Sequence, residues 1–148
     1  MNKPIAERRT AQAQAGRWRM LGGAATAVMM TFNLVCTGTV TTTSYNDRKS
    51  APYNYVYRID LSKSRWCDGE CKSINEVASV QPASITLKDK KEDGPFSKSS
   101  TRNVINRETG EHSILHVRRL SATPFSMEWQ GTCTPSPFTG FPDFKTKF

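Results

Sequence analysis

Apolar and polar residues alternate along much of this chain, and a period of two predicts β-strands rather than helices. In residues 31–43, the even positions from Phe32 to Val40 share one face, and the β-branched content also favours a strand. Residues 53–61 give the clearest strand, with one aromatic and aliphatic face and one more polar face. Residues 125–133 repeat the alternation near the end of the chain.

The segments between these strands carry turn signals. Residues 102–107 and 112–117 predict a hairpin, because Gly110 supplies the positive φ that its turn needs. Apolar residues spaced by three in 73–80 predict a short helical turn, which Pro82 ends. Residues 88–101 are polar, carry mixed charge and contain Gly-Pro, which is typical of a mobile loop.

These elements predict an all-β fold. Six to eight short antiparallel strands in a mature chain of about 118 residues are typical of a small antiparallel meander barrel or sandwich, here with one short helical turn and a preceding N-terminal helical leader. A parallel α/β fold is not favoured, because no convincing amphipathic helix separates two of the strands.

The N-terminus predicts export. Residues 1–19 are polar and basic, and the apolar run Met20–Met30 has the length of a signal-peptide core. An uncleaved anchor is the alternative, because residues 20–40 carry no charge and could span a bilayer. We therefore expect a leader in 1–31 and a β-domain in 32–148, located in the periplasm or secreted, or anchored to the membrane if the leader is retained.

The cysteines predict a disulfide framework, since an even set behind an export signal is typical of an oxidising compartment. One pair spans a tight loop, and the other two cysteines lie on the first and last strands, which are neighbours in a closed barrel. Of three connectivities, the favoured one is Cys36–Cys133 plus Cys67–Cys71. A four-cysteine zinc site is the rival, but such sites use two close pairs and this chain has one.

Charge and motifs narrow the function classes. Half of the net charge of +8 lies in residues 1–20, and residues 21–148 carry 16 basic and 12 acidic side chains. The β-domain is only mildly basic, so nucleic acid is not an expected partner. No nucleophile elbow, phosphate loop or metalloprotease motif occurs. We expect no catalytic residue, no metal, no cofactor and therefore no enzyme.

Three sets of side chains remain as candidates for binding or chemistry. The stripe of Tyr53, Tyr55 and Tyr57 could stack on a sugar, lipid or base, or it could be the buried face of a core strand. Phe138 and Phe141 in the tail could contact a partner, or the tail could fold back and cap an open barrel end. The two histidines, His112 and His116, lie about 13 Å apart on a strand, too far to share a metal, and are interpreted as surface or rim residues.

Six short motifs follow one another along the chain: Phe32-Asn33-Leu34-Val35-Cys36, Tyr57-Arg58-Ile59-Asp60-Leu61, Trp66-Cys67-x-Gly69-x-Cys71, Ile105-Asn106-Arg107-x-Thr109-Gly110, Gly131-x-Cys133 and Phe138-x-Gly140-Phe141-Pro142. This ordered set resembles a family of uncharacterised, small, cysteine-containing exported proteins of Gram-negative bacteria. The resemblance covers residues 32–148 and implies a periplasmic location and a mature domain that starts near Phe32. It implies no activity, so no catalytic residue can be carried over, and the long basic segment 1–19 departs from a usual leader.

The layout is more loosely similar to the periplasmic inhibitors of C-type lysozyme, which are small disulfide-tied β-barrels with Arg/Thr-Gly hairpins. The leading hypothesis is an exported, non-enzymatic β-domain that binds or supports a cell-envelope component. The alternative is a proteinaceous inhibitor of a cell-wall hydrolase. The expected partner is an unknown protein or envelope ligand, with membrane contact only through an uncleaved N-terminal segment.

Overall fold

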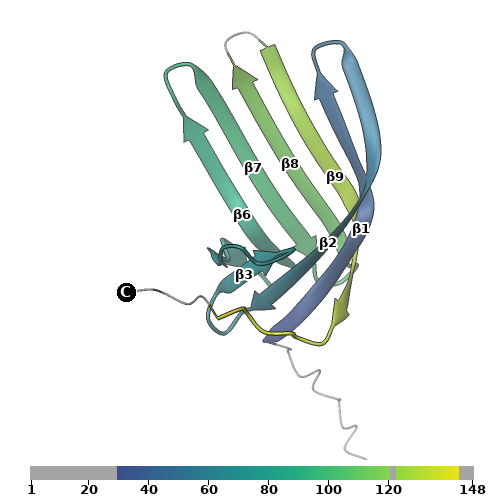
Figure 1. Ribbon diagram of the computed structural model, residues 1–148, viewed down its shortest axis with the longest axis vertical. Coiled ribbons are helices and arrows are strands. Elements are labelled where there is room, and N and C mark those ends of the chain that lie inside the picture. The colour runs from purple at the N-terminus through teal and green to yellow at the C-terminus, as the bar shows by residue number, and fades with distance from the viewer. Residues whose placement is uncertain (1–29, 121–122, 144–148) are drawn as a thin grey trace, which may run out of the picture.

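A computed structural model describes residues 30–120 and 123–143 of the 148-residue chain. These residues form one antiparallel sheet of nine strands that curls strongly into a half-barrel (Figure 1). The all-β prediction is confirmed, whereas the expected leader lies outside the described residues. The strands are β1 Thr31–Ser44, β2 Asp47–Asp60, β3 Arg65–Asp68, β4 Asn75–Glu76, β5 Ser79–Val80, β6 Ser84–Asp93, β7 Ser97–Asn106, β8 Glu111–Leu120 and β9 Thr123–Ser136.

Two predicted elements are wrong. Within residues 73–80, Asn75–Glu76 and Ser79–Val80 form the short strands β4 and β5 instead of a helical turn. Of the three apolar residues spaced by three, only Val77 is buried, so they do not share one buried helical face. Residues 88–101 belong to the β6–β7 hairpin instead of a mobile loop. Nowhere in the described ranges is there a helix long and apolar enough to cross a membrane.

The first and last strands are neighbours, as expected, but they do not close a barrel. The strand order is β4-β3-β2-β1-β9-β8-β7-β6-β5, so β1 and β9 lie in the middle of the sheet. Its two edges are the short strands β4 and β5, which residues 77 and 78 connect along the chain. The sheet is therefore an open half-barrel whose edges are joined covalently.

The hydrophobic core fills the inner face at one end of the half-barrel, which we call the core end. Alternate residues of the long strands point into it, as the period-two pattern predicts. The turns of the β1–β2 and β6–β7 hairpins and the end of β8 lie at the opposite end (Figure 1). The buried cluster consists of Leu34, Cys36, Tyr53, Tyr57, Ile59, Trp66, Val77, Ile85, Leu87, Ile105 and Cys133.

The C-terminal tail folds back, as predicted, but it lies on the outer face of the sheet. Asn33 donates a hydrogen bond to the Thr139 hydroxyl over 2.9 Å, and Arg58 donates to the Gly140 carbonyl over 3.0 Å. Asn33 and Arg58 alternate with core-facing residues of β1 and β2, so their side chains project from the outer face of the sheet. The tail therefore does not cap the open barrel end.

Candidate functional site

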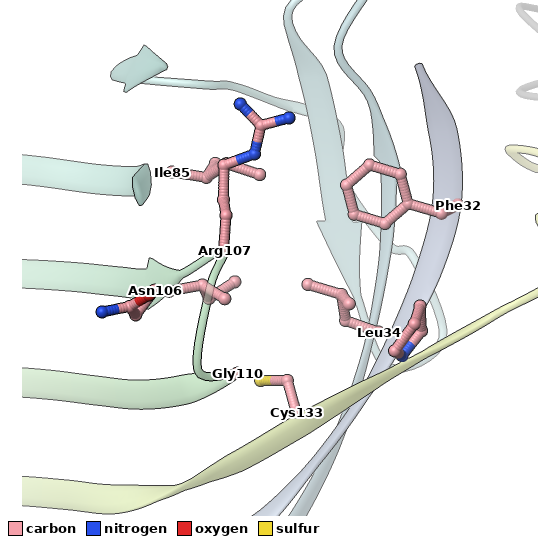
Figure 2. Close-up of a pocket in the computed structure, with 9 residues that line it drawn as sticks. Phe32, Leu34, Ile85, Asn106, Arg107, Gly110 and Cys133 are labelled. Carbon is pink, nitrogen blue, oxygen red and sulfur yellow. The ribbon is translucent and has the colours of Figure 1, made fainter. Parts of the chain in front are cut away.

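An apolar pocket opens at the core end, between the paired strands β1 and β9 on one side and β6, β7 and the β7–β8 turn on the other (Figure 2). Its volume is about 210 Å³. The pocket exists because the sheet curls and is open here: β1 does not pair with β6 or β7, which form the opposite wall. Its lining is Phe32, Leu34, Ile85, Ile105, Asn106, Arg107, Gly110, Cys133 and Pro135.

The exposed side chain of Arg107 supplies the only charge in this lining. Its Nη1 donates one hydrogen bond to the Gln81 carbonyl over 3.3 Å, and Phe32 projects from the opposite wall (Figure 2). A guanidinium has five N–H donors and does not lose its proton in proteins, so further donors remain for a ligand. The site therefore combines an apolar cavity with a permanently charged arginine side chain beside it.

The turn that carries Arg107 is held rigidly. The Asn106 side chain accepts hydrogen bonds from the backbone N–H groups of Glu108 and Thr109, over 2.8 and 3.1 Å, and so closes the turn. Gly110 has a φ of +76°, and its carbonyl accepts a hydrogen bond from Cys133 N over 2.7 Å. This wall of the pocket is therefore tied to β9 before any ligand arrives.

A buried polar network lies deeper on the inner face, around His112. The Tyr53 hydroxyl lies 2.8 Å from His112 Nδ1, and Asn103 Oδ1 lies 3.1 Å from Nε2. The Tyr57 hydroxyl is 3.3 Å from Nε2 and accepts a hydrogen bond from Asn103 Nδ2 over 3.2 Å. The prediction of a surface or rim histidine is wrong for His112, which has no exposed surface; His116 is half-buried.

Two facing glycines make this network geometrically feasible. Four neighbouring strands each place one residue in the same register: Tyr53 on β2, Gly38 on β1, Gly131 on β9 and His112 on β8. Three strand spacings separate β2 from β8, a distance of about 14 Å along the sheet. A Cβ on Gly131 would overlap the Tyr53 hydroxyl and the backbone of β1. Because both intervening residues lack side chains, the Tyr53 ring can reach over them to the imidazole.

The network fixes the protonation of His112. The Asn103 carbonyl oxygen can only accept, so Nε2 carries the proton and Nδ1 accepts from the Tyr53 hydroxyl. Burial lowers the pKa of His112 from 6.5 to about 4, because the charged ring would lose its hydration. Burial also raises the pKa of both Tyr53 and Tyr57. All three groups are therefore neutral at pH 7.

None of the aromatic residues singled out in the sequence lines the pocket. Tyr53 and Tyr57 are buried in the core, and the Tyr55 hydroxyl accepts a hydrogen bond from Trp129 over 3.1 Å. Phe138 and Phe141 contact each other edge to face in the tail, with ring centroids 5.5 Å apart. The tyrosine stripe is the inner face of β2, the second of the two interpretations that the sequence left open.

Both favoured disulfides are present. Cys36 and Cys133 face each other across β1 and β9 with their Cα atoms 4.0 Å apart, and Cys67 is bonded to Cys71 beside β3. The sulfurs of the first bridge and a nitrogen of His112 lie within 4.8 Å of one another. These sulfurs are bonded to each other and are not thiolates, so the cluster is not a set of metal ligands. The disulfides indicate an oxidising, extracytoplasmic location.

Sequence reasoning missed the pocket and the buried histidine. The pocket draws on β1, β6, β7, β9 and one turn, and only the curl of the sheet brings them together. The histidine had a signal, because glycines within strands mark places of close approach. Comparison of the chain with protein-family models, curated proteins and solved structures finds no significant match.

Proposed function

We propose that this chain is an exported, non-enzymatic β-domain of the periplasm that binds a cell-envelope component in the apolar pocket at its core end. The observation that carries the proposal is the pairing of an apolar cavity with the Arg107 guanidinium beside it. The two disulfides support export, because such bonds persist outside the cytosol.

The pocket suits a narrow, amphiphilic ligand. Its volume of about 210 Å³ lies below the range of sites for drug-sized molecules. One apolar group, such as part of a single acyl chain, would lie against Leu34, Ile85 and Ile105. An anionic head group would then meet Arg107, which can form charge-assisted hydrogen bonds with it.

A binding role accounts for the perturbed groups better than catalysis does. His112 and Tyr57 have shifted pKa values, which are often a sign of an active site. Here both side chains are fully buried and hydrogen-bonded within the same network. A catalytic group must reach its substrate, so this network supports a structural role.

Calorimetric titration of the exported protein with dodecanoate, an anionic single-chain amphiphile, tests the proposal. We expect saturable binding of dodecanoate, and we expect Arg107→Gln to weaken this binding about tenfold. The same substitution should leave the affinity for a neutral dodecyl glycoside unchanged. Arg102→Gln, which removes an exposed arginine of β7 away from the pocket, is the matched control and should change nothing. Absence of saturable binding, or equal losses in both variants, would contradict the proposal.

A further inference from the structure

Three exposed apolar side chains occupy the hairpin turns at the end opposite the pocket. Tyr45 lies in the β1–β2 turn with 77% of its surface exposed, and Phe96 lies in the β6–β7 turn with 82% exposed. Leu120 ends β8 with 47% exposed, and it pairs with Ser97, the residue after Phe96. We call this set of turns the hairpin rim (Figure 1).

Tyr45 is placed there against the preference of the backbone. It is the first central residue of a two-residue turn and has a φ of +49°, a region that disfavours bulky L-residues and favours glycine. Its ring is almost fully exposed, so burial does not offset this cost. A strained, exposed aromatic residue at a turn is the kind of outlier that points to function.

The half of the sheet that ends in the rim is also the more basic half of the domain. Segments 41–50, 88–102 and 115–128 contain nine lysines and arginines and five acidic residues. The rest of residues 30–143 contains five basic and seven acidic residues. Among the described residues, salt bridges at this end engage Lys49 with Asp47 and Lys90 with Glu92. The other seven basic side chains of these segments remain for an external anion.

Two of these cations lie directly behind the apolar tips. Lys98 of β7 pairs with Arg119 of β8, one position from the Ser97–Leu120 pair. Like charges directly opposite each other destabilise a sheet, although Asp93 on the other side of Lys98 relieves part of the repulsion. A surface that concentrates exposed aromatics above unpaired cations is complementary to an anionic interface.

We propose that the hairpin rim attaches this domain to the surface of an anionic phospholipid bilayer. The aromatic and aliphatic tips enter the headgroup region, where amphipathic rings are favoured. The basic side chains behind them contact lipid phosphates, an attraction that falls off within a Debye length. The apolar pocket then opens away from that bilayer.

This inference does not rest on the pocket or its ligand. It revises the expectation that only an N-terminal segment contacts a membrane, because the rim lies on the far side of the domain from Thr31, where β1 begins (Figure 1). An experiment must therefore report on the rim itself, and not only on the presence of protein on vesicles.

Quenching by spin-labelled lipids gives such a readout in the full-length chain. Phe96→Trp places a reporter on the rim, and Leu115→Trp places a matched reporter at a residue that is 48% exposed midway along β8. On vesicles of phosphatidylcholine with about one quarter phosphatidylglycerol, we expect stronger quenching of the reporter at position 96. Equal quenching, or quenching only at position 115, overturns the proposal even if an N-terminal segment holds the protein on the vesicles.

A second set of variants separates stability from attachment. Tyr45→Gly should raise the melting temperature or leave it unchanged, since glycine suits the positive φ. It should also lower the quenching of the reporter at position 96, which we call rim quenching. Lys98→Glu with Arg119→Glu should lower rim quenching severalfold, whereas Lys63→Glu with Lys72→Glu at the other end should not. Quenching that survives the first charge reversal, or that is equal on pure phosphatidylcholine, overturns the role of anionic lipid. Absence of quenching at position 96 overturns the attachment to a bilayer and leaves a protein partner, such as a cell-wall hydrolase, as the occupant of the rim.

Discussion

At the scale of single residues, the inner face depends on side chains that are missing as much as on those that are present. Gly38 and Gly131 face each other across β1 and β9; a Cβ on Gly38 would meet the backbone of β9, and a Cβ on Gly131 would meet the Tyr53 hydroxyl. This hydroxyl in turn holds the imidazole of His112. The centre of the sheet therefore depends on two positions that tolerate no Cβ.

Substitution of the second glycine tests this arrangement. Gly131→Ala should lower the free energy of unfolding by about 1–3 kcal/mol, because its methyl group overlaps the Tyr53 hydroxyl and the backbone of β1. Urea denaturation measures the change. Gln130→Ala, at the exposed neighbouring position, is the control and should cost little. A change below about 0.5 kcal/mol in Gly131→Ala would show that the sheet relaxes around the methyl group.

Burial of a neutral histidine predicts acid lability. The pKa of His112 is about 4 in the folded state and 6.5 when unfolded, so between these values the unfolded chain binds the extra proton. The stability contributed by the neutral ring is fully present above pH 6.5 and is lost as pH falls toward 4, by up to about 1.4 kcal/mol per pH unit. Urea unfolding at several pH values measures this slope.

The histidine variants identify the group responsible. His112→Gln should be less stable at pH 7, because it disturbs the hydrogen bonds with Tyr53 and Asn103, but its stability should vary less between pH 6.5 and 4. His116→Gln, on the same strand, should keep the slope of the unmodified protein. If both variants keep the slope, another group binds the proton.

At the scale of elements, sequence predicted those strands that have one buried face. β1, β2, β9 and the β7–β8 hairpin alternate because every second residue enters the core. The outer half of β6 extends beyond the core and is exposed on both faces, so its residues show no alternation and their composition predicts a loop. The pocket was not predictable in the same way, because it lies between β1 and β6–β7, which are not neighbours in the sheet and which only the curl of the sheet brings together.

The two disulfides should contribute unequally to stability. Cys36 and Cys133 are 97 residues apart, whereas Cys67 and Cys71 are four apart. In the chain-entropy model the long bridge contributes about 4.7 kcal/mol and the short one about 2 kcal/mol. Paired serine variants should therefore differ in urea midpoint, with the Cys36→Ser, Cys133→Ser protein the less stable. The reverse order would mean that the short bridge does more than restrict the unfolded chain.

At the scale of the whole molecule, the two ends of the half-barrel differ in composition and so in what they can contact. The core end holds the apolar cluster and the pocket, and the hairpin end holds an excess of cations beneath exposed aromatic tips. Because β1 and β9 pair in the middle of the sheet, the start of β1 and the end of β9 both lie at the core end.

This central meeting of the first and last strands makes the domain suited to circular permutation. A chain that joins residue 143 to residue 30 through a short linker and opens at Gly94–Pro95 keeps every strand pair except the tip of one exposed hairpin. The bridge between Cys36 and Cys133 would then close a loop of about 25 residues, and its contribution should fall by about 1 kcal/mol. We expect the permutant to fold. Replacing both cysteines by serine should lower its free energy of unfolding by less than the same replacement does in residues 30–143 in natural order, and urea unfolding measures both losses. An equal loss in the two connectivities would mean that the bridge acts on the folded sheet, by holding β1 against β9, and not on the unfolded chain.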